Sequence, residues 1–336
     1  MKFKDLLERV IQGQNLSHAE MQETMQAVMS GGLSAAQIAS LAVALRIKGE
    51  TVTELLAAVE VMRNYSDKVI IDDDEYLIDT CGTGGDSHHT FNVSTTSAFV
   101  AAAAGAKVAK HGGRSVSSSC GSADVIEALG VRLAQTPERI SASVQQVGLG
   151  FIFASHYHRA MQYATPVRKD LGVRTLFNLL GPLTNPAGAK RQVLGVFSAG
   201  WTHTLAAVLQ RLGSVHVMVV SGQEGLDELA LSGSSMVSEL KDGYIHDYKV
   251  HPHDFGFDVC PLSAIQVRNQ EEAVQMLNGV LRGEAGPARD IVLLNAGAAI
   301  YVAGLVASLQ EGIVVARRTL DSGLAQQKLI DLIAFS

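Results

Sequence analysis

Between Tyr76 and about residue 221, short apolar segments alternate with segments of helical periodicity. We expect strands near 76–78, 106–110, 149–153, 192–198 and 215–221, and helices near 94–104, 122–129 and 137–146. Alternation of this kind is typical of a layered α/β domain in which helices cover a sheet. From about residue 269 to the end the pattern is helical.

The first 70 residues have a different, wholly helical pattern. A hydroxyl residue followed three positions later by Glu or Gln predicts a helix start, and this capping box occurs three times in quick succession: Ser17 with Glu20, Ser34 with Gln37, and Thr51 with Glu54. We therefore expect a helical domain over 1–70, joined in space by a later helical segment near 165–185. The α/β domain then covers 71–336.

Composition excludes several classes of protein. The formal net charge of the 336 residues is −6, which argues against a nucleic-acid-binding surface. No run of 18 apolar residues predicts a membrane span, and the charged N-terminus is unlike a signal peptide. The three cysteines are widely spaced, which favours a reducing compartment, and we expect a cytoplasmic protein.

Two loops have the composition of anion-binding sites. The first, Gly82-Thr83-Gly84-Gly85-Asp86, follows a predicted strand, and Ser94-Thr95 opens the next helix. Glycines bring main-chain amides close to an anion, and a helix N-terminus adds further donors. The second begins at Lys110-His111-Gly112-Gly113-Arg114 and continues into a serine-rich run that ends at Ser122. An ordinary turn is the alternative in each case, but two such loops together favour a polyphosphate site.

Further candidate residues come later in the chain. Asp227 and Glu228 are adjacent carboxylates of the kind that binds Mg²⁺, although such a pair is more often simply solvated. Arg168 lies on a predicted helix and could pair with a substrate carboxylate or be a surface residue. His156 and His158 alternate as in an extended segment and lack a third ligand at metal spacing.

In this order the motifs resemble the anthranilate phosphoribosyltransferase family. The resemblance rests on residues 79–86, Phe91-Asn92-Val93-Ser94-Thr95, Lys110-His111-Gly112, residues 121–130 and residues 178–186, and extends over essentially the whole chain. It implies a small N-terminal helical domain, often the dimer interface, and a larger α/β domain with a mixed sheet, a fold shared with nucleoside phosphorylases. It also implies transfer of the phosphoribosyl group of PRPP to anthranilate in tryptophan biosynthesis, with two Mg²⁺ ions per subunit.

The resemblance also assigns roles by matched position. PRPP would be bound by Gly82, Gly84, Gly85, Asp86, Thr90, Asn92, Ser94, Thr95, Lys110, Ser118, Ser119 and Ser122, and Mg²⁺ by Ser94, Asp227 and Glu228. Anthranilate would meet Thr83, His111, Gly112, Gly113 and Arg168, with His158 in its entry tunnel. Lys110, Asp86 and Arg168 would be the catalytic residues, chiefly by stabilising the pyrophosphate leaving group and placing the substrates.

Two positions depart from the family pattern. Gly113 stands where the family usually has an Asn that contacts the acceptor, and Arg159 stands where Pro commonly follows the tunnel histidine. Both concern the acceptor, so a phosphoribosyltransferase with a different aromatic acceptor is one alternative. A pyrimidine nucleoside phosphorylase of the same fold and a non-catalytic, nucleic-acid-binding paralogue are two others.

Overall fold

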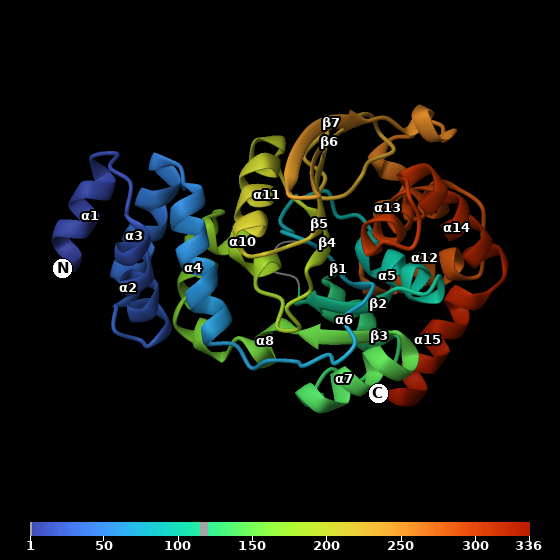
Figure 1. Cartoon of the computed structure of the whole chain (residues 1–336), viewed down its shortest axis with the longest axis horizontal. Helices are drawn as coiled ribbons and strands as arrows, with labels where there is room; N and C mark the ends of the chain where they lie inside the picture. Colours follow the sequence, from blue (N-terminus) through green and yellow to red (C-terminus); the bar gives the residue numbers. More distant parts are fainter. Residues whose placement is uncertain (1, 115–119) are drawn as a thin grey trace.

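The computed structural model describes residues 2–114 and 120–336. Its first four helices form a bundle at one end of the molecule, in blue in Figure 1: α1 (Phe3–Ile11), α2 (His18–Met29), α3 (Ala35–Lys48) and α4 (Val52–Asn64). All three predicted capping boxes are present at the starts of α2, α3 and α4. In each, the hydroxyl accepts from one orphan main-chain amide and the Glu or Gln accepts from another.

The rest of the chain is built on one seven-stranded sheet. Its strands are β1 (Leu77–Gly82), β2 (Lys107–Gly112), β3 (Leu149–Phe153), β4 (Arg191–Gly195), β5 (His216–Gly222), β6 (Ser235–Lys241) and β7 (Tyr244–Val250), in the order β3-β2-β1-β4-β5-β6-β7. The first five in this order are parallel, while β6 and β7 are antiparallel. The sheet is therefore mixed, as predicted.

Helices cover both faces of the sheet. One face packs against α5 (Val93–Ala103), α12 (Gln270–Leu281), α13 (Pro287–Ala303), α14 (Leu309–Asp321) and α15 (Leu324–Phe335), which enclose the largest apolar core. The other face carries α7 (Pro137–Val147) and α11 (Thr202–Arg211). Short elements complete the chain: α6 (Ser122–Ala128), α8 (Ala154–Tyr157), α9 (Thr165–Leu171), α10 (Leu176–Leu180), η1 (Arg159–Tyr163), η2 (Gly181–Leu183), η3 (Ala199–Trp201), η4 (Pro252–Phe255) and η5 (Leu262–Ala264).

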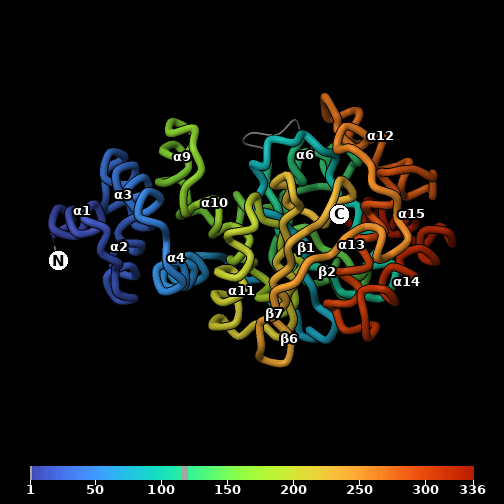
Figure 2. Tube along the Cα trace, turned by 90° about the horizontal axis from the view of Figure 1, so that it is seen from above, coloured from blue at the N-terminus to red at the C-terminus, as the bar shows by residue number. Residues whose placement is uncertain are grey.

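The segment from α9 to α10 lies against the N-terminal bundle. α9 packs on α3, and α10 packs on α3 and α4, so residues far apart in sequence lie side by side (Figure 2). Their apolar side chains, including Val167 and Leu176, share one core with the four N-terminal helices. We therefore propose that the helical domain consists of residues 1–70 together with a segment near 165–185, and the α/β domain of the remainder of 71–336.

Two features of the fold differ from what the sequence patterns predicted: one was not predicted, and the other was predicted wrongly. The hairpin of β6 and β7 was not predicted, although Asp242-Gly243, both with positive φ, makes its turn. The segment with His156 and His158 is not extended: residues 154–157 form the helical turn α8, and η1 begins at Arg159. Within residues 2–114 and 120–336, no helix combines the length and the apolar character needed to cross a membrane.

Candidate active site

The candidate site lies at the carboxyl ends of the parallel strands. The chain passes from β1 to β2 and β3 on one side, and later from β4 to β5 on the other, so the strand order reverses between β1 and β4. Such a reversal leaves a crevice at the carboxyl ends of the strands, where α/β proteins bind ligands. β1 ends at Gly82, β4 at Gly195 and β5 at Gly222, and the segments after β1 and β5 carry the predicted phosphate and metal residues.

Asp227 fits into a slot between two of these strand ends. A Cβ atom at Gly195 would lie 1.6 Å from the main-chain oxygen of Asp227, and one at Gly82 would lie 2.3 Å from its Oδ2. No side chain can occupy either position without displacing Asp227. The two glycines therefore determine how closely this carboxylate approaches the sheet.

The loop of residues 82–86, called the glycine loop below, bends through two consecutive left-handed residues. Gly84 has φ 63° and Gly85 has φ 69°, a conformation that favours glycine. The amide of Gly84 donates to Asp227 Oδ2 at 2.7 Å, and the amide of Thr83 donates to the Gly195 carbonyl at 2.9 Å. The glycine loop is thereby joined directly to the carboxylate predicted to bind metal.

The start of α5 meets the other carboxylate and the buried lysine. The Ser94 amide donates to Glu228 Oε1 at 3.0 Å, and Lys110 Nζ on β2 lies 3.2 Å from Ser94 Oγ. Lys110 also donates to the Thr80 carbonyl and is only 2% exposed. A helix N-terminus, a hydroxyl and an ammonium group thus converge beside two carboxylates, an arrangement that suits a magnesium-bound diphosphate.

Asp79 on β1 is a member of this cluster to which the sequence patterns gave no role. Burial lowers the pKa of Lys110, and the negative charge of Asp79 is the main influence that opposes this effect. Asp79 itself is fully buried, and its Oδ1 accepts from the His111 amide at 3.1 Å. It therefore helps Lys110 to keep its charge and holds the start of the second anion loop.

The carboxylates are in an environment that calls for a cation. Burial raises the pKa of Asp227 to about 7, with a further contribution from the charge of Asp86. Burial and the charge of Asp227 likewise raise the pKa of Glu228 well above its usual range. A divalent cation would relieve this repulsion, and oxygen ligands are what Mg²⁺ prefers. The donor set therefore fits Mg²⁺.

The other predicted PRPP residues surround the start of α5. Asn92 donates to the Cys120 carbonyl at 3.1 Å, while its Oδ1 is buried without a partner among the described residues. Thr90 makes an isolated bridge to Gln266, and Ser122 Oγ lies 3.3 Å from the Gly113 carbonyl. Ser118 and Ser119 lie outside the described residues.

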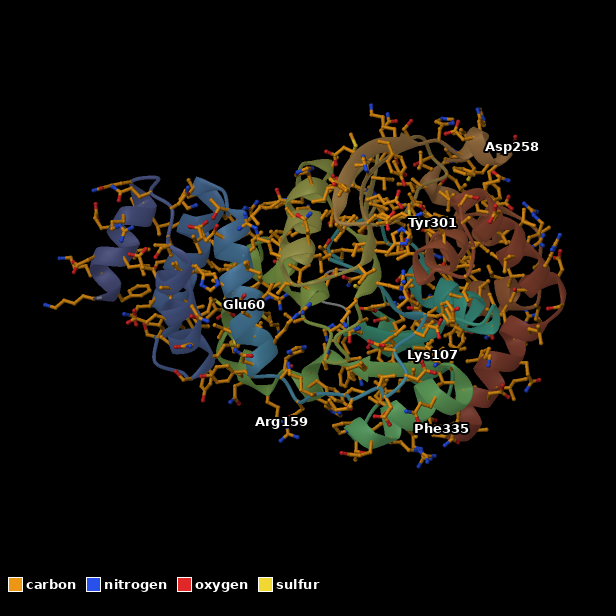
Figure 3. All side chains as sticks on the ribbon, viewed as in Figure 1. Glu60, Lys107, Arg159, Asp258, Tyr301 and Phe335 are labelled. Atoms are coloured by element: carbon orange, nitrogen blue, oxygen red, sulfur yellow. The ribbon has the colours of Figure 1, made fainter. Side chains whose placement is uncertain are left out.

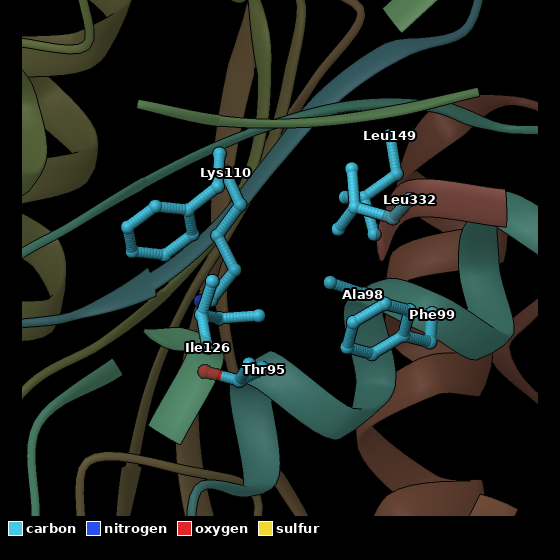
Figure 4. A pocket seen from close by; sticks show the side chains of 8 residues that line it. Thr95, Ala98, Phe99, Lys110, Ile126, Leu149 and Leu332 are labelled. Atoms are coloured by element: carbon cyan, nitrogen blue, oxygen red, sulfur yellow. The ribbon is translucent and has the colours of Figure 1, made fainter. Parts of the chain in front are cut away.

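Thr95 is a further predicted PRPP residue, and its hydroxyl is buried without a partner among the described residues. It is 1% exposed and lines a small internal space beside the apolar part of Lys110, together with Phe99 and Ile126 (Figure 4).

Two histidines form a separate pair on the predicted acceptor side. The rings of His111 and His158 meet edge to face, with centroids 5.1 Å apart. Burial lowers the pKa of His158 to about 4 and that of His111 well below its usual range, so both imidazoles are neutral at pH 7. Both Nε2 atoms are buried without a partner among the described residues. Buried polar atoms of this kind need a partner, which a bound ligand or an ordered water can supply.

Within residues 2–114 and 120–336, no hydrogen bond or ion pair joins the Arg168 side chain to the histidine pair. It lies on α9, which packs on α3 and η1, and its guanidinium has no recorded anionic partner in that part of the chain. Burial lowers the pKa of Arg168, which leaves a half-buried cation available to a carboxylate.

The two residues that depart from the family pattern occupy different surroundings. Among the described residues, a Cβ atom at Gly113 would meet only Ala154 Cβ, at 4.0 Å. Arg159 is 82% exposed, points outward from the molecule (Figure 3) and lies 3.7 Å from Asp67. The extra positive charge is thus partly balanced by a neighbouring carboxylate.

Comparison with known proteins agrees with this architecture. Residues 74–326 match the family model for the glycosyl transferase family a/b domain, and residues 4–66 match that for the helical bundle domain of the same family. The fold and the site therefore define a two-domain glycosyl transferase.

Individual relatives narrow this class. The chain is 56% identical to the anthranilate phosphoribosyltransferase of Thiobacillus denitrificans, with 98% of this chain and 96% of that protein covered. The crystal structure of the Thermus thermophilus enzyme matches with TM-score 0.92 and 44% identity over 98% of each chain. The Saccharomyces cerevisiae enzyme in complex with PRPP and Mg matches with TM-score 0.90 and 26% identity, covering 99% of this chain and 97% of that one. This chain belongs to the anthranilate phosphoribosyltransferase family.

Proposed function

We propose that this chain transfers the 5-phosphoribosyl group of PRPP to the amino group of anthranilate. The products are N-(5-phosphoribosyl)anthranilate and pyrophosphate, in tryptophan biosynthesis. The observation that carries the proposal is the partly buried pair Asp227–Glu228, joined by hydrogen bonds to Gly84 of the glycine loop and to Ser94 at the start of α5. The names of the relatives and the yeast complex with PRPP and Mg support the same donor and metal.

The donor half of the site binds the diphosphate of PRPP. The glycine loop and the amides at the start of α5 would contact its oxygens, and Ser94, Asp227 and Glu228 would hold magnesium, for which we expect two ions per subunit. No group of three or more His, Cys, Asp or Glu in the described part of the chain is arranged to bind a metal alone. This suits Mg²⁺, which commonly shares its ligands with substrate phosphates and waters. When bound, magnesium neutralises charge on the departing pyrophosphate.

Lys110 acts on the same leaving group. Its ammonium group is already fixed by the Thr80 carbonyl and the Ser94 hydroxyl, so little reorganisation is needed as negative charge develops on pyrophosphate. The nitrogen of an aromatic amine is a poor nucleophile, so the reaction depends strongly on this stabilisation. We infer that Lys110 is the main catalytic side chain contributed by the protein.

The acceptor half would bind anthranilate through groups of two kinds. Neutral His111 and His158 each present an unpartnered Nε2, which can accept a hydrogen bond from an amino group. Arg168 would pair with the carboxylate of anthranilate, and Thr83 and Gly113 would line the pocket. Since the described contacts do not link Arg168 to the histidines, we expect the helical domain to move toward the α/β domain when the substrates bind. A related structure of the yeast enzyme contains 4-fluoroanthranilate.

Two further proposals concern the setting of this activity. We expect a homodimer formed through the N-terminal bundle, where Ile11 and Ile47 are exposed at 63% and 81%. We also expect a cytoplasmic enzyme, because all three cysteines are free thiols.

The assay follows the loss of anthranilate fluorescence with PRPP and Mg²⁺ present. We expect magnesium-dependent loss with release of pyrophosphate, abolished by EDTA. The variant Lys110→Met should lower kcat about 100-fold, the usual effect of removing a fixed charge-stabilising group. Lys107→Met, three residues earlier on β2 and paired with Asp73 at the surface, is the matched control. Binding of PRPP without turnover of anthranilate would show that another aromatic amine is the acceptor.

A further inference from the structure

Arg174, in the link between α9 and α10, contacts the glycine loop from outside all the motifs described above. Its Nη2 donates to the Gly85 carbonyl, and its guanidinium lies over the ring of Phe197, 4.3 Å from the centroid. Phe197 follows β4, and its amide lies 3.3 Å from the Thr83 hydroxyl. The glycine loop is therefore held at two residues: Arg174 contacts Gly85, and Phe197 contacts Thr83.

The glycine loop depends on such external contacts for its shape. Neither Gly84 nor Gly85 has a side chain to anchor it, and glycine loses more conformational freedom on ordering than any other residue. The Gly84 amide is held by Asp227 on one side, and the Gly85 carbonyl is held by Arg174 on the other. In a trans peptide the carbonyl and the following N–H point in opposite directions. Holding the Gly85 carbonyl therefore directs the Asp86 amide away from Arg174.

The main chain of Arg174 is held from the N-terminal bundle. Arg46, in the last turn of α3, donates through Nη1 to the Arg174 carbonyl at 2.5 Å. Arg174 is thus joined to α3 through its main-chain carbonyl and to the glycine loop through its side chain. A shift of α3 relative to the sheet would act on the Gly85 carbonyl through this connection.

We propose that Arg174 is a positioning residue for PRPP: it holds the glycine loop in the conformation that receives the diphosphate and links that conformation to the position of the helical domain. The inference rests on the proposed function, because it requires a PRPP site at the glycine loop. Arginine suits the task, since its planar group can stack on an aromatic ring and donate at its edge at the same time. Lysine has no planar group that can stack on the ring and donate from its edge.

The test measures the affinity for PRPP separately from turnover. Calorimetric titration with PRPP and saturating Mg²⁺, without anthranilate, should show about tenfold weaker binding for Arg174→Gln and Arg174→Lys. In steady-state assays the KM for PRPP should rise, while the KM for anthranilate stays within about twofold. Arg46→Gln should give a smaller rise of the same kind, about threefold. Lys169→Gln, which removes an exposed cation from α9, is the matched control and should bind PRPP as the wild type does.

Each outcome has a definite meaning. Weaker PRPP binding by the Arg174 variants, with a melting temperature close to that of the wild type in the ligand-free state, supports the inference. Unchanged PRPP binding by variants that are only less stable would overturn it, because Arg174 would then be a structural residue alone. If the wild-type chain bound PRPP but did not consume anthranilate, the acceptor assignment would fail and the inference would stand on the binding data. If the wild type bound no PRPP, both the proposed function and the inference about Arg174 would be wrong.

Discussion

Gly113 is one of the two positions predicted to depart from the family pattern, and it belongs to the predicted acceptor side. Its φ is not in the left-handed region, and within residues 2–114 and 120–336 an added Cβ would meet nothing closer than 4.0 Å. Neither backbone strain nor a close approach therefore requires glycine here. Glycine at this position provides no side chain that could hydrogen-bond to the acceptor.

The variant Gly113→Asn tests this reading. We expect the KM for anthranilate to fall about tenfold, the effect of one added hydrogen bond in a buried site, while the KM for PRPP stays unchanged. Steady-state kinetics at saturating PRPP provide the measurement. Gly200→Asn, at an exposed glycine far from the site in sequence, is the control. A rise in the KM for anthranilate would mean that the space at Gly113 is needed for the acceptor.

Residue patterns identified much of the candidate site, but not the contacts between its parts. The glycine loop, Lys110 and the Asp227–Glu228 pair could be singled out because each belongs to a local pattern with a chemical meaning. Asp79 and Arg174 could not be assigned roles in this way. Their effects depend on Lys110 and Gly85, which are brought to them only by the packing of strands and by the position of α10.

Among the elements, α4 has the most tightly buried capping interaction of the bundle. Glu54 is 1% exposed, accepts from the amides of Thr51 and Leu16 at 2.8 Å, and lies 2.9 Å from Lys48 Nζ. The corresponding Glu20 at the start of α2 is partly exposed. The same sequence motif therefore differs in energetic importance between the two helices.

We expect Glu54→Ala to reduce the free energy of unfolding by about 3 kcal/mol, because it leaves two amides without partners and removes the only carboxylate that pairs with the buried Lys48 ammonium group in the described part of the chain. Glu20→Ala, in the exposed capping box, should cost about 1 kcal/mol. Urea denaturation followed by circular dichroism would measure both variants. Equal losses would show that the burial of Glu54 adds nothing to its capping role.

Elements were predictable where their pattern was local and repeated. The parallel strands and their helices follow from alternating apolar segments, with ends that differ from the expected ones by a few residues. The antiparallel strands β6 and β7 were not predicted: β7 is largely exposed and has a weak apolar signal, although the Asp242-Gly243 turn was a usable sign. The segment with His156 and His158 was predicted to be extended because the two histidines alternate, whereas residues 154–157 form a single helical turn.

At the scale of the whole molecule, a buried polar network joins the antiparallel edge of the sheet to α13. Glu239 on β6 is hydrogen-bonded to His216 on β5, Tyr248 on β7 and Tyr301 on α13, each at 2.8 Å (Figure 3 labels Tyr301). Burial alone would raise the pKa of Glu239, but these hydrogen bonds outweigh it and lower the pKa from 4.5 to about 2. The network therefore favours the ionised carboxylate.

The lowered pKa of Glu239 predicts how the free energy of unfolding depends on pH. Because the pKa of Glu239 is lower in the folded state, its contribution is complete above about pH 4.5 and is lost as the pH falls toward 2. The shift corresponds to roughly 3 kcal/mol. The difference in melting temperature between the wild type and Glu239→Gln should shrink over this window, while exposed Glu271→Gln should show no such trend. A constant difference from pH 7 to pH 2 would contradict the assignment.

The close packing of Asp227 against Gly82 and Gly195 also restricts how the sequence of this enzyme can evolve. Gly82, Gly195 and Asp227 meet at distances that leave no room for even a methyl group. A single substitution at either glycine would displace the carboxylate before any second substitution could restore it. Such intermediates should be eliminated, so the three positions should vary only together, even in descendants that acquire a new acceptor.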